Sequence, residues 1–499
     1  MSRTATLGVD IGTSSSKGVL TDTATGEVLA TAVVEHAVQR PREGHVEMDP
    51  QVWWDEFVHL TKELLASETQ AKIIAVGVSG MGPCVALTDR AGLPVRPAIL
   101  YGVDTRATAQ ITRLSAELGA AIAEVCGSRL TSQAAGPKVA WVREEEPAAY
   151  ARASRLFMPA SFLVNRLTGA YVLDHQSASQ CTPLYDINEH TWREDWWELI
   201  APGIEKPTLA WAGDIAGRIT DDAASATGLP TGLPVIAGTI DAWTEAVSVD
   251  AHRDGDLMLM YGTTMFLVAT GAKVIRTPSM WTTVGAFEGT HNLAGGLATS
   301  GALTAWIKDL TGSDYTTLLQ EAEQSPAGSN GLLMLPYFAG ERTPILDPNA
   351  RGVIAGLTLT HTRGDLYRAA LEATAFGVRH NIETMRMAGA KISRVVAVGG
   401  GARGGLWLQI VSDVTNLPQT IPATLVGASY GAAFLAAQAV HAAPESMSEW
   451  NPAVDLITPR AQHSRFYDDL FVQYTDLYRL TKPIVHTLVN HQTSEGASQ

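Results

Sequence analysis

The chain opens with a strand, a glycine turn and a second strand, and this hairpin constrains the fold more than any other feature. Residues 5–11 read as an apolar strand with Asp10 near its end, residues 12–16 read Gly-Thr-Ser-Ser-Ser, and residues 17–21 read as the next strand. Dinucleotide and Walker-type phosphate sites place their glycine loop between a strand and a helix. A glycine turn inside a hairpin therefore predicts a different architecture.

The same pattern returns in the second half of the chain. A strand at 257–261 leads into Gly262, Thr263 and Thr264, and a second strand follows at 265–269. One echo is too little for a repeat array, so it predicts two related α/β lobes. The length of 499 residues also exceeds one comfortable hydrophobic core. We expect a first lobe at 1–246, a second at 247–491 and a disordered tail at 492–499.

Asp10 and its turn predict a phosphate and metal site. Gly12 lets the backbone approach a phosphate, while Thr13 and Ser14 add hydroxyl and N–H groups. Asp10 could hold a magnesium ion that keeps several of its waters. A plain turn explains an isolated Asp-x-Gly-Thr equally well, so the prediction depends on the second hairpin. Two such turns could grip the phosphates of a nucleotide from opposite sides of a central cleft.

A run of glycines follows a predicted strand at 394–398. Gly399, Gly400, Gly401 and Ala402 lead to a helix through Trp407, and the run matches G-x-G-x-x-G. A dinucleotide site would need an acidic residue about 20 positions further on, where residues 419–422 read Gln-Thr-Ile-Pro. We therefore favour an adenosine platform over a dinucleotide site, although a tight strand–helix crossing would look the same.

Asp241 follows a predicted strand at 235–240 and precedes an apolar helical stretch. A helix N-cap is the simplest interpretation of this position. A carboxylate at the end of a buried strand could also act as the general base that accepts a proton from an attacking hydroxyl. The two roles are compatible.

Composition and charge exclude several classes of function. A net charge of -15 disfavours nucleic acid, which requires clustered Lys and Arg, but backbone N–H groups and a metal ion can still bind a nucleotide. We expect a cytoplasmic protein with no membrane partner, because no secretory signal and no apolar run of about 20 residues is evident. Cys84, Cys126 and Cys181 are too widely spaced for a disulfide framework or a zinc site, so we expect buried thiols.

Several motifs together are similar to one family. Residues 340–344 read Gly-Glu-Arg-Thr-Pro, residues 351–357 read Arg-Gly-Val-Ile-Ala-Gly-Leu, and Asp365-Leu366 and Ala-Ala-Leu-Glu at 369–372 follow. This pattern resembles the second signature of the FGGY carbohydrate kinases. The resemblance extends over nearly the whole chain, including Lys138 with Trp141, and Gly238 with Asp241.

The resemblance implies an actin-like, ribonuclease H-like α/β fold of two lobes around a nucleotide and sugar cleft. It implies ATP-dependent, magnesium-dependent phosphorylation of a small sugar, with Asp241 as the base. Family members are often dimers, so a homodimer is compatible with the resemblance. We expect the sugar on the first lobe and most of the ATP on the second. The cofactor residues are Asp10, also the metal ligand, with Gly12, Thr13, Ser14, Gly262, Thr263, Thr264, Gly301, Gly399, Gly400, Gly401 and Ala402.

The sugar pocket departs from the family pattern. Residues 79–84 read Ser-Gly-Met-Gly-Pro-Cys, at the position of the Gly-Gln-Met-His-Gly stretch of xylulose kinases, without its Gln or His. Tyr101 replaces a common Trp, Ala242 replaces an amide residue, and Gln133 and Ala135 precede Lys138 where other residue types are usual. The leading candidate for the phosphorylated group is a primary hydroxyl of a ketopentose such as xylulose. Other ketoses, polyols and sugar acids are the next candidates.

Sugar binding needs side chains that pair hydroxyl groups and an apolar face for the C–H side of the ring. We expect Asp104 and Asp241 as acceptors and Tyr101 or Trp243 as the apolar cover, although both aromatics could be ordinary core residues. The predicted substrate residues are Met81, Gly82, Tyr101, Asp104, Asp241, Ala242 and Trp243.

Three other classes remain open. An actin-like or chaperone-like ATPase would share both phosphate hairpins but needs no polar sugar pocket. A dinucleotide oxidoreductase would need the missing ribose acid. A catalytically silent sugar-binding relative would lack turnover with every sugar, although Asp10, Asp241 and the glycine run are all present.

Overall fold

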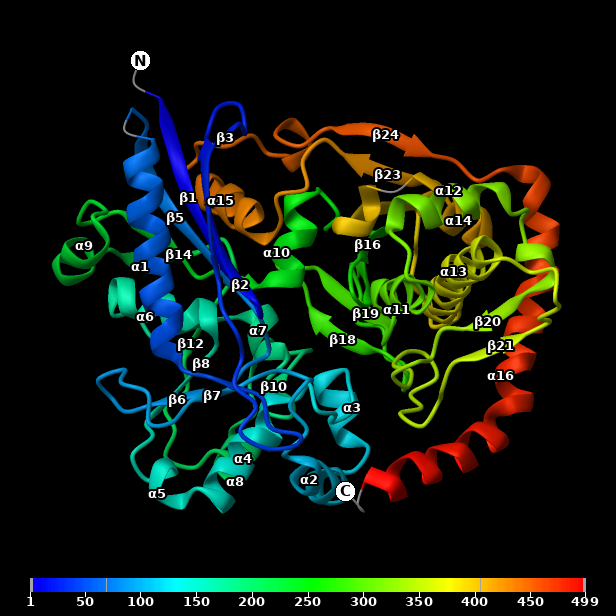
Figure 1. Ribbon diagram of the computed structural model, residues 1–499. Coiled ribbons are helices and arrows are strands. Elements are labelled where there is room, and N and C mark those ends of the chain that lie inside the picture. Colours follow the sequence, from blue (N-terminus) through cyan, green and yellow to red (C-terminus); the bar gives the residue numbers. More distant parts are fainter. Residues whose placement is uncertain (1–2, 69, 404, 497–499) are drawn as a thin grey trace. The chain divides into compact units, whose positions relative to one another are not determined.

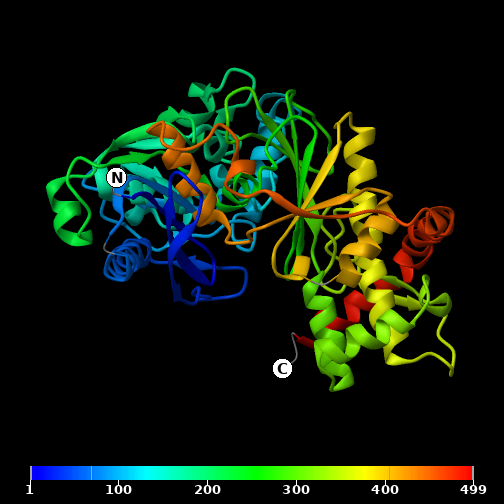
Figure 2. The ribbon, with the colours of Figure 1, turned by 90° about the horizontal axis from the view of Figure 1, so that it is seen from above.

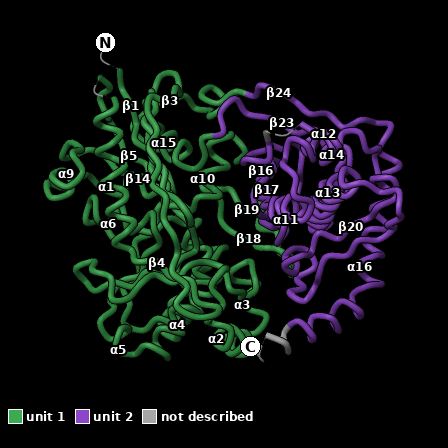
Figure 3. The backbone as a smooth tube through the Cα atoms, viewed as in Figure 1, with its two compact units in different colours: residues 1–254, 270–292, 426–452 green, residues 255–269, 293–425, 453–499 purple. Residues whose placement is uncertain are grey.

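The computed structural model describes residues 3–68, 70–403 and 405–496 (Figure 1). The chain forms two compact α/β units and passes between them several times (Figure 3). Unit 1 comprises Met1–Asp254, Thr270–Asn292 and Val426–Pro452, and unit 2 comprises Gly255–Ala269, Leu293–Leu425 and Ala453–Gln499. The predicted α/β class is confirmed.

Unit 1 is built on a seven-stranded sheet of order β13-β14-β5-β1-β2-β3, with β15 paired to β5 beside this path. The predicted hairpin is present, because β1 and β2 pair antiparallel, and β1 also pairs parallel with β5. The strands are β1 (Thr4–Ile11), β2 (Ser15–Asp22), β3 (Val28–Glu35), β5 (Lys72–Gly80), β13 (Ile215–Arg218), β14 (Pro234–Ile236) and β15 (Thr239–Ile240).

Helix α1 (Pro50–Ser67) shows how local sequence sets an element of this unit. The side chain of Asp49 accepts a hydrogen bond from the backbone N–H of Gln51, and Pro50 occupies the first turn, where a missing N–H costs nothing. Trp53, Phe57 and Leu60 recur at helical spacing and are fully buried. The helix therefore begins at a capped proline and turns its apolar face to the sheet.

A pair of glycines lets a helix from the C-terminal part of the chain pack closely against this sheet. Gly8 and Gly77 are partners in the β1–β5 ladder. A Cβ atom would lie 1.9 Å from the carbonyl oxygen of Ser429 at Gly8, and 2.0 Å from that of Ala432 at Gly77. Only glycine permits this approach. Helix α15 (Ala428–Ala439) therefore packs against β1 and β5, as Figures 1 and 2 both show.

The rest of unit 1 consists of short elements around the sheet and a second apolar core. These are β4 (Glu47–Met48), β6 (Ala86–Thr88), β7 (Ala98–Ile99), α2 (Thr108–Leu118), α3 (Ala121–Cys126), α4 (Ala135–Glu145), α5 (Pro147–Tyr150), β8 (Arg155–Phe157), α6 (Pro159–Thr168), β9 (Val172–Asp174), α7 (His175–Ser179), β10 (Tyr185–Asp186), β11 (Thr191–Trp192), α8 (Glu194–Ile200), β12 (Thr208–Ala210), α9 (Asp221–Thr227), α10 (Asp241–Ser248), β18 (Trp281–Val284) and η3 (Met447–Glu449).

Unit 2 repeats the pattern of the first sheet. Strands β16 and β17 form an antiparallel hairpin, β16 pairs parallel with β22, and β22 pairs parallel with β23. The predicted echo of the opening hairpin is therefore real. The elements are β16 (Asp256–Tyr261), β17 (Met265–Gly271), β19 (His291–Leu297), α11 (Gly301–Thr311), α12 (Tyr315–Gln324), η1 (Ser329–Gly331), β20 (Leu333–Leu335), β21 (Val353–Ala355), α13 (Arg363–Met387), β22 (Arg394–Val398), η2 (Gly400–Arg403), α14 (Gly405–Thr415), β23 (Gln419–Pro422), β24 (Ala453–Ile457) and α16 (Ala461–Gly496).

Two predicted boundaries differ from the structure. The lobes are not contiguous at residue 246, because residues 270–292 and 426–452 return to unit 1. The strand predicted at 235–240 is divided into β14 and β15, because Gly238 has a φ of +68° and lies against the carbonyl oxygen of Val78.

The predicted tail also differs. Helix α16 continues to Gly496, so residues 492–496 are helical, and residues 497–499 lie outside the described part of the chain. Within the described residues, no helix has both the length and the apolar character needed to span a membrane. The three cysteines are buried thiols, as expected.

Candidate active site

Strand register brings Asp10 and Asp241 to one edge of the unit 1 sheet. Asp10 on β1 is the partner of Ser79 on β5, and Ser79 is the partner of Thr239 on β15. Strand β15 ends at Ile240, and Asp241 opens helix α10 immediately afterwards. Because β1, β5 and β15 run parallel, their carboxyl ends meet, and this edge is where α/β sheets bind ligands.

Asp241 is the first residue of α10, so Ile240, and not Asp241, is the N-cap. Its Oδ1 accepts a hydrogen bond of 2.7 Å from the backbone N–H of Ala242. Burial raises the pKa of Asp241 well above its ordinary value, and the carboxylates of Asp10 and Glu245 raise it further. The group therefore has the elevated basicity that suits a general base.

Asp10 lies in the same electrostatic environment. Burial raises the pKa of Asp10 to about 6, and the Ser79 hydroxyl and the Lys17 ammonium oppose that rise. Its Oδ1 atom is buried and accepts no hydrogen bond from the described residues.

This unsatisfied carboxylate oxygen fits magnesium. Mg²⁺ binds through one or two carboxylates and fills its other positions with water and phosphate oxygens. Across the described ranges, no three His, Cys, Asp or Glu side chains are grouped to hold a metal ion by themselves. A magnesium site at Asp10 would therefore depend on water and on the phosphates of the substrate.

Sequence reasoning missed Glu245 as a member of this site. Glu245 lies four residues after Asp241 on α10, so the two side chains share one helix face. Burial raises the pKa of Glu245 to about 7, Asp10 adds to the rise, and Lys17 opposes it. The helical spacing was the signal that could have identified it.

Lys17 provides the positive charge near these carboxylates. It follows the hairpin turn on β2, and its Nζ donates a hydrogen bond of 2.5 Å to the carbonyl oxygen of Val426, which precedes α15. The opening hairpin is thereby linked to the C-terminal segment of unit 1.

The turn between β1 and β2 stays accessible. Gly12 donates a backbone hydrogen bond of 3.1 Å to Ser15, Thr13 is partly exposed and Ser14 is exposed. The hydroxyl groups of Thr13 and Tyr101 form a hydrogen bond of 2.9 Å. These groups lie in the turn that directly follows the strand carrying Asp10.

Unit 2 contains a cavity of about 730 Å³, a volume typical of small-molecule sites. Five predicted nucleotide residues line it: Gly262, Thr263, Gly301, Gly400 and Gly401. The remaining lining residues, which the sequence analysis did not select, are Tyr261, Ala302, Thr304, Ala305, Tyr315, Leu319, Tyr367, Leu371 and Trp407. A glycine and aromatic lining suits a flat base and a ribose.

The floor of this cavity is organised by backbone hydrogen bonds. The N–H groups of Gly301 and Ala302, at the start of α11, donate to the carbonyl oxygens of Gly262 and Thr263. Thr264, Gly399 and Ala402 adjoin the lining residues in the chain but are not among them. The second hairpin turn, α11 and the glycine run therefore form one site, although they are far apart in the sequence.

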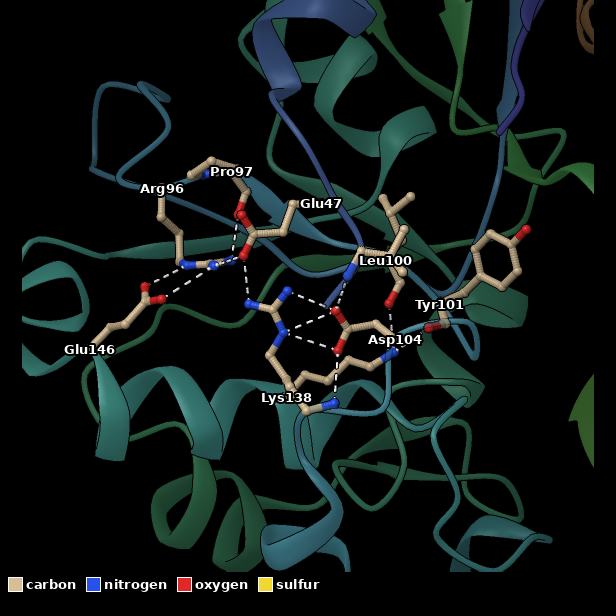
Figure 4. Close-up of polar contacts among 10 residues, drawn as sticks. Glu47, Arg96, Pro97, Leu100, Tyr101, Asp104, Lys138 and Glu146 are labelled. Carbon is tan, nitrogen blue, oxygen red and sulfur yellow. Dashed lines mark hydrogen bonds and ion pairs between the residues drawn. The ribbon is translucent and has the colours of Figure 1, made fainter. Parts of the chain in front are cut away.

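Three predicted substrate residues are buried. Met81 and Trp243 lie in the hydrophobic cores, and the Trp243 indole donates to Asn292. Asp104 has no exposed surface, and its carboxylate accepts hydrogen bonds from Arg106 and from the backbone of Val46 (Figure 4). The prediction that Asp104 accepts a sugar hydroxyl is wrong, because both of its oxygens are already used.

The other predicted substrate residues remain available. Gly82, Tyr101, Asp241 and Ala242 are each partly exposed. Residue type alone could not show whether Met81 and Trp243 lie in a hydrophobic core or line a substrate pocket.

Models of both halves of one family match the chain. The N-terminal domain of the FGGY family of carbohydrate kinases matches residues 5–248, and the C-terminal domain matches residues 257–440. Together the two matches define a carbohydrate kinase. The chain belongs to the FGGY family of carbohydrate kinases.

Individual relatives give the same family over the full length. A xylulose kinase of Staphylococcus xylosus is 26% identical over 95% of this chain and 99% of its own length. The crystal structure of a xylulose kinase from Rhodospirillum rubrum has a TM-score of 0.89 at 30% identity, covering 96% of this chain and 99% of that one. A gluconate kinase structure from Lactobacillus acidophilus also has a TM-score of 0.89 at 22% identity, over 96% and 98% of the two chains, which shows the shared fold.

Proposed function

We propose that this enzyme transfers the terminal phosphoryl group of ATP to a primary hydroxyl of a small sugar, with a ketopentose such as xylulose as the leading candidate. The observation that carries the proposal is that Asp10 and Asp241 lie at the carboxyl ends of β1 and β15, which both pair parallel with β5. The names of the relatives support a ketopentose, since those from Staphylococcus xylosus and Rhodospirillum rubrum are xylulose kinases.

Asp241 would act as the general base. A carboxylate whose pKa is raised by burial and by neighbouring negative charge accepts a proton more readily than an ordinary aspartate. The helix position fixes the carboxylate, because its Oδ1 is held by the N–H of Ala242. The attacking hydroxyl would thereby lose its proton as the new bond to phosphorus forms.

Asp10 would hold magnesium, which supplies positive charge to the transferred phosphoryl group. Thr13 and Ser14 offer hydroxyl and backbone N–H groups beside it, as an anion-binding turn does. The cavity of unit 2 would bind the adenosine part, with the bare backbone of Gly400 and Gly401 against the base and ribose. Catalysis would then consist of positioning and electrostatic stabilisation.

The pocket residues leave other acceptors open. Residues 79–84 lack the Gln and His of the xylulose kinase stretch, and Met81 is buried. Specificity for a sugar depends on a small number of hydroxyl pairings, so these changes bear directly on substrate choice. Other ketoses, polyols and sugar acids are therefore the alternatives.

A screen of pentuloses, hexuloses, alditols and aldonates with ATP, reported as kcat/KM, tests the proposal. The highest kcat/KM should belong to a ketopentose, and the product should be a sugar phosphate by phosphorus NMR. A preference for an alditol or an aldonate would contradict the ketopentose assignment. Free phosphate without any sugar phosphate would favour an actin-like ATPase instead.

A further inference from the structure

The hydroxyl of Tyr101 connects two parts of unit 1 that are distant in sequence. It forms a hydrogen bond of 2.9 Å with the Thr13 hydroxyl, across a separation of 88 residues. Thr13 belongs to the turn between β1 and β2, and Tyr101 follows β7. Both residues are partly exposed, so the bond lies at the surface of the proposed site and not in a core.

Buried groups hold the backbone of Tyr101 in place. The Lys138 ammonium donates hydrogen bonds of 2.7 Å to the carbonyl oxygen of Leu100 and 2.8 Å to that of Tyr101 (Figure 4). The N–H of Asp104 donates to the same Tyr101 oxygen at 3.0 Å. On the following residue, Gln133 accepts the Gly102 N–H at 3.0 Å.

Lys138 lies beside a buried charge network. Its side chain is 1% exposed, and burial lowers the pKa of Lys138 to about 8, while Asp104 opposes that shift. Asp104 pairs with Arg106, whose other nitrogen reaches Glu47 at 2.6 Å. Glu47 in turn pairs with Arg96 at 2.5 Å, and Arg96 with Glu146 at 2.6 Å (Figure 4).

Such a network is rigid for an electrostatic reason. Moving one member would leave another charge buried without a partner, which costs about 3–5 kcal/mol. The backbone of Tyr101 therefore has a fixed position, from which only the ring and the hydroxyl extend. A rigid support of this kind is what a precisely placed side chain requires.

We propose that Tyr101 is a positioning residue for the phosphate-binding turn, and that its hydroxyl fixes Thr13 in the orientation that meets the phosphates of ATP. This inference rests on the proposed function of that turn. A tryptophan, common at this position in the family, has no hydroxyl to offer, so the link depends on the tyrosine of this chain. The anchored network then adds a side-chain contact at Thr13 to a turn whose backbone is already bonded to His36 at Gly12 and Ser14.

Four proteins test the inference: the wild type, Tyr101→Phe, Thr13→Val and the double variant. The readout is kcat/KM for ATP with the best accepted sugar at saturation. Tyr101→Phe keeps the ring and removes one neutral hydrogen bond, so it should lower kcat/KM about fivefold in the wild-type background. In the Thr13→Val background the same change should have no effect, because the partner hydroxyl is already missing.

An equal decrease in both backgrounds would overturn the inference, and so would an unchanged kcat/KM for Tyr101→Phe in the wild-type background. Tyr150→Phe is the matched control, since it removes a hydroxyl that donates 2.9 Å to the carbonyl oxygen of Pro202, away from the turn. Its kcat/KM should equal that of the wild type.

A second readout separates this inference from the proposed acceptor. The dissociation constant of ATP, measured by calorimetry without sugar, should rise about fivefold for Tyr101→Phe in the wild-type background alone. A wild type that phosphorylates no sugar would contradict the proposed function, whereas equal weakening of ATP binding in both backgrounds would contradict the role of Tyr101.

Discussion

Replacing Asp241 with asparagine should abolish most of the phosphoryl transfer while leaving the fold intact. The amide keeps the shape of the side chain, and its oxygen can still accept the 2.7 Å hydrogen bond from the N–H of Ala242. It cannot accept a proton from the attacking hydroxyl. General base catalysis typically contributes about two to four decades of rate, so kcat should fall by that amount, about 2.7–5.4 kcal/mol of activation free energy.

The same substitution should not lower stability. Burial and the charges of Asp10 and Glu245 disfavour the ionised form of Asp241, as its raised pKa indicates. A neutral asparagine removes this repulsion, so the melting temperature should be equal to or higher than that of the wild type at pH 8. ATP binding, measured by calorimetry, should persist because the cavity of unit 2 is unaltered.

The assay is a coupled measurement of kcat with the best accepted sugar, beside a thermal unfolding curve. Asp186→Asn is a matched control, because Asp186 is a buried carboxylate that accepts the N–H of Asn188 at 2.9 Å outside the proposed site. Its kcat should be unchanged. A kcat for Asp241→Asn within about tenfold of the wild type would refute the base assignment, because general base catalysis contributes more than that.

Three other predictions follow from contacts in unit 1. The kcat/KM should decrease as the pH falls through the raised pKa of Asp241. Glu245→Gln should move this acidic limb of the pH–rate profile to lower pH, because removing a negative neighbour favours the ionised form of Asp241. An acidic limb that stays in place would contradict the coupling between the two carboxylates. Asp104→Asn should lower the free energy of unfolding of unit 1 by about 3–5 kcal/mol in a denaturant titration, because it leaves the buried Arg106 with one charged partner fewer. Asp195→Asn, which removes an exposed ion pair, should lower it by only about 0–1 kcal/mol. Gly77→Ala should lower the melting temperature by displacing α15, whereas Gly213→Ala should leave it unchanged, because a Cβ at Gly213 has nothing within 4 Å.

The sequence contains enough information to predict the positions of Asp10 and Asp241 and the repeated hairpin. Asp10 and Asp241 are each placed by the end of an apolar strand, and a local pattern of that kind survives folding. Gly262 and Gly400 were likewise identified from turns, and both line the cavity of unit 2. These positions depend on short-range backbone geometry, which the local sequence largely determines.

The sugar pocket could not be predicted in the same way. Asp104 and Met81 lie next to recognisable motifs, but the direction of a side chain depends on packing partners far along the chain. Asp104 is turned inward by Arg106 and by the backbone of Val46. Glu245 was missed although its spacing from Asp241 is helical, because its nearness to Asp10 depends on the tertiary structure.

Local sequence patterns also could not predict which unit each segment belongs to. Residues 426–452 read as an alanine-rich helix and a loop, with no signal that they belong to the first half of the chain. Their place is set by the close approach at Gly8 and Gly77, which face Ser429 and Ala432 of α15, more than 350 positions further along the chain.

This arrangement has a consequence for how the protein is made. The ribosome synthesises β1 and β5 long before α15, so the surface around Gly8 and Gly77 stays exposed to water until α15 has been made. A truncated chain that stops before Val426 would lack the helix that covers this surface and the carbonyl group that receives Lys17. Expression of the N-terminal half alone should therefore yield an aggregation-prone fragment, even though a family domain model matches its residues 5–248.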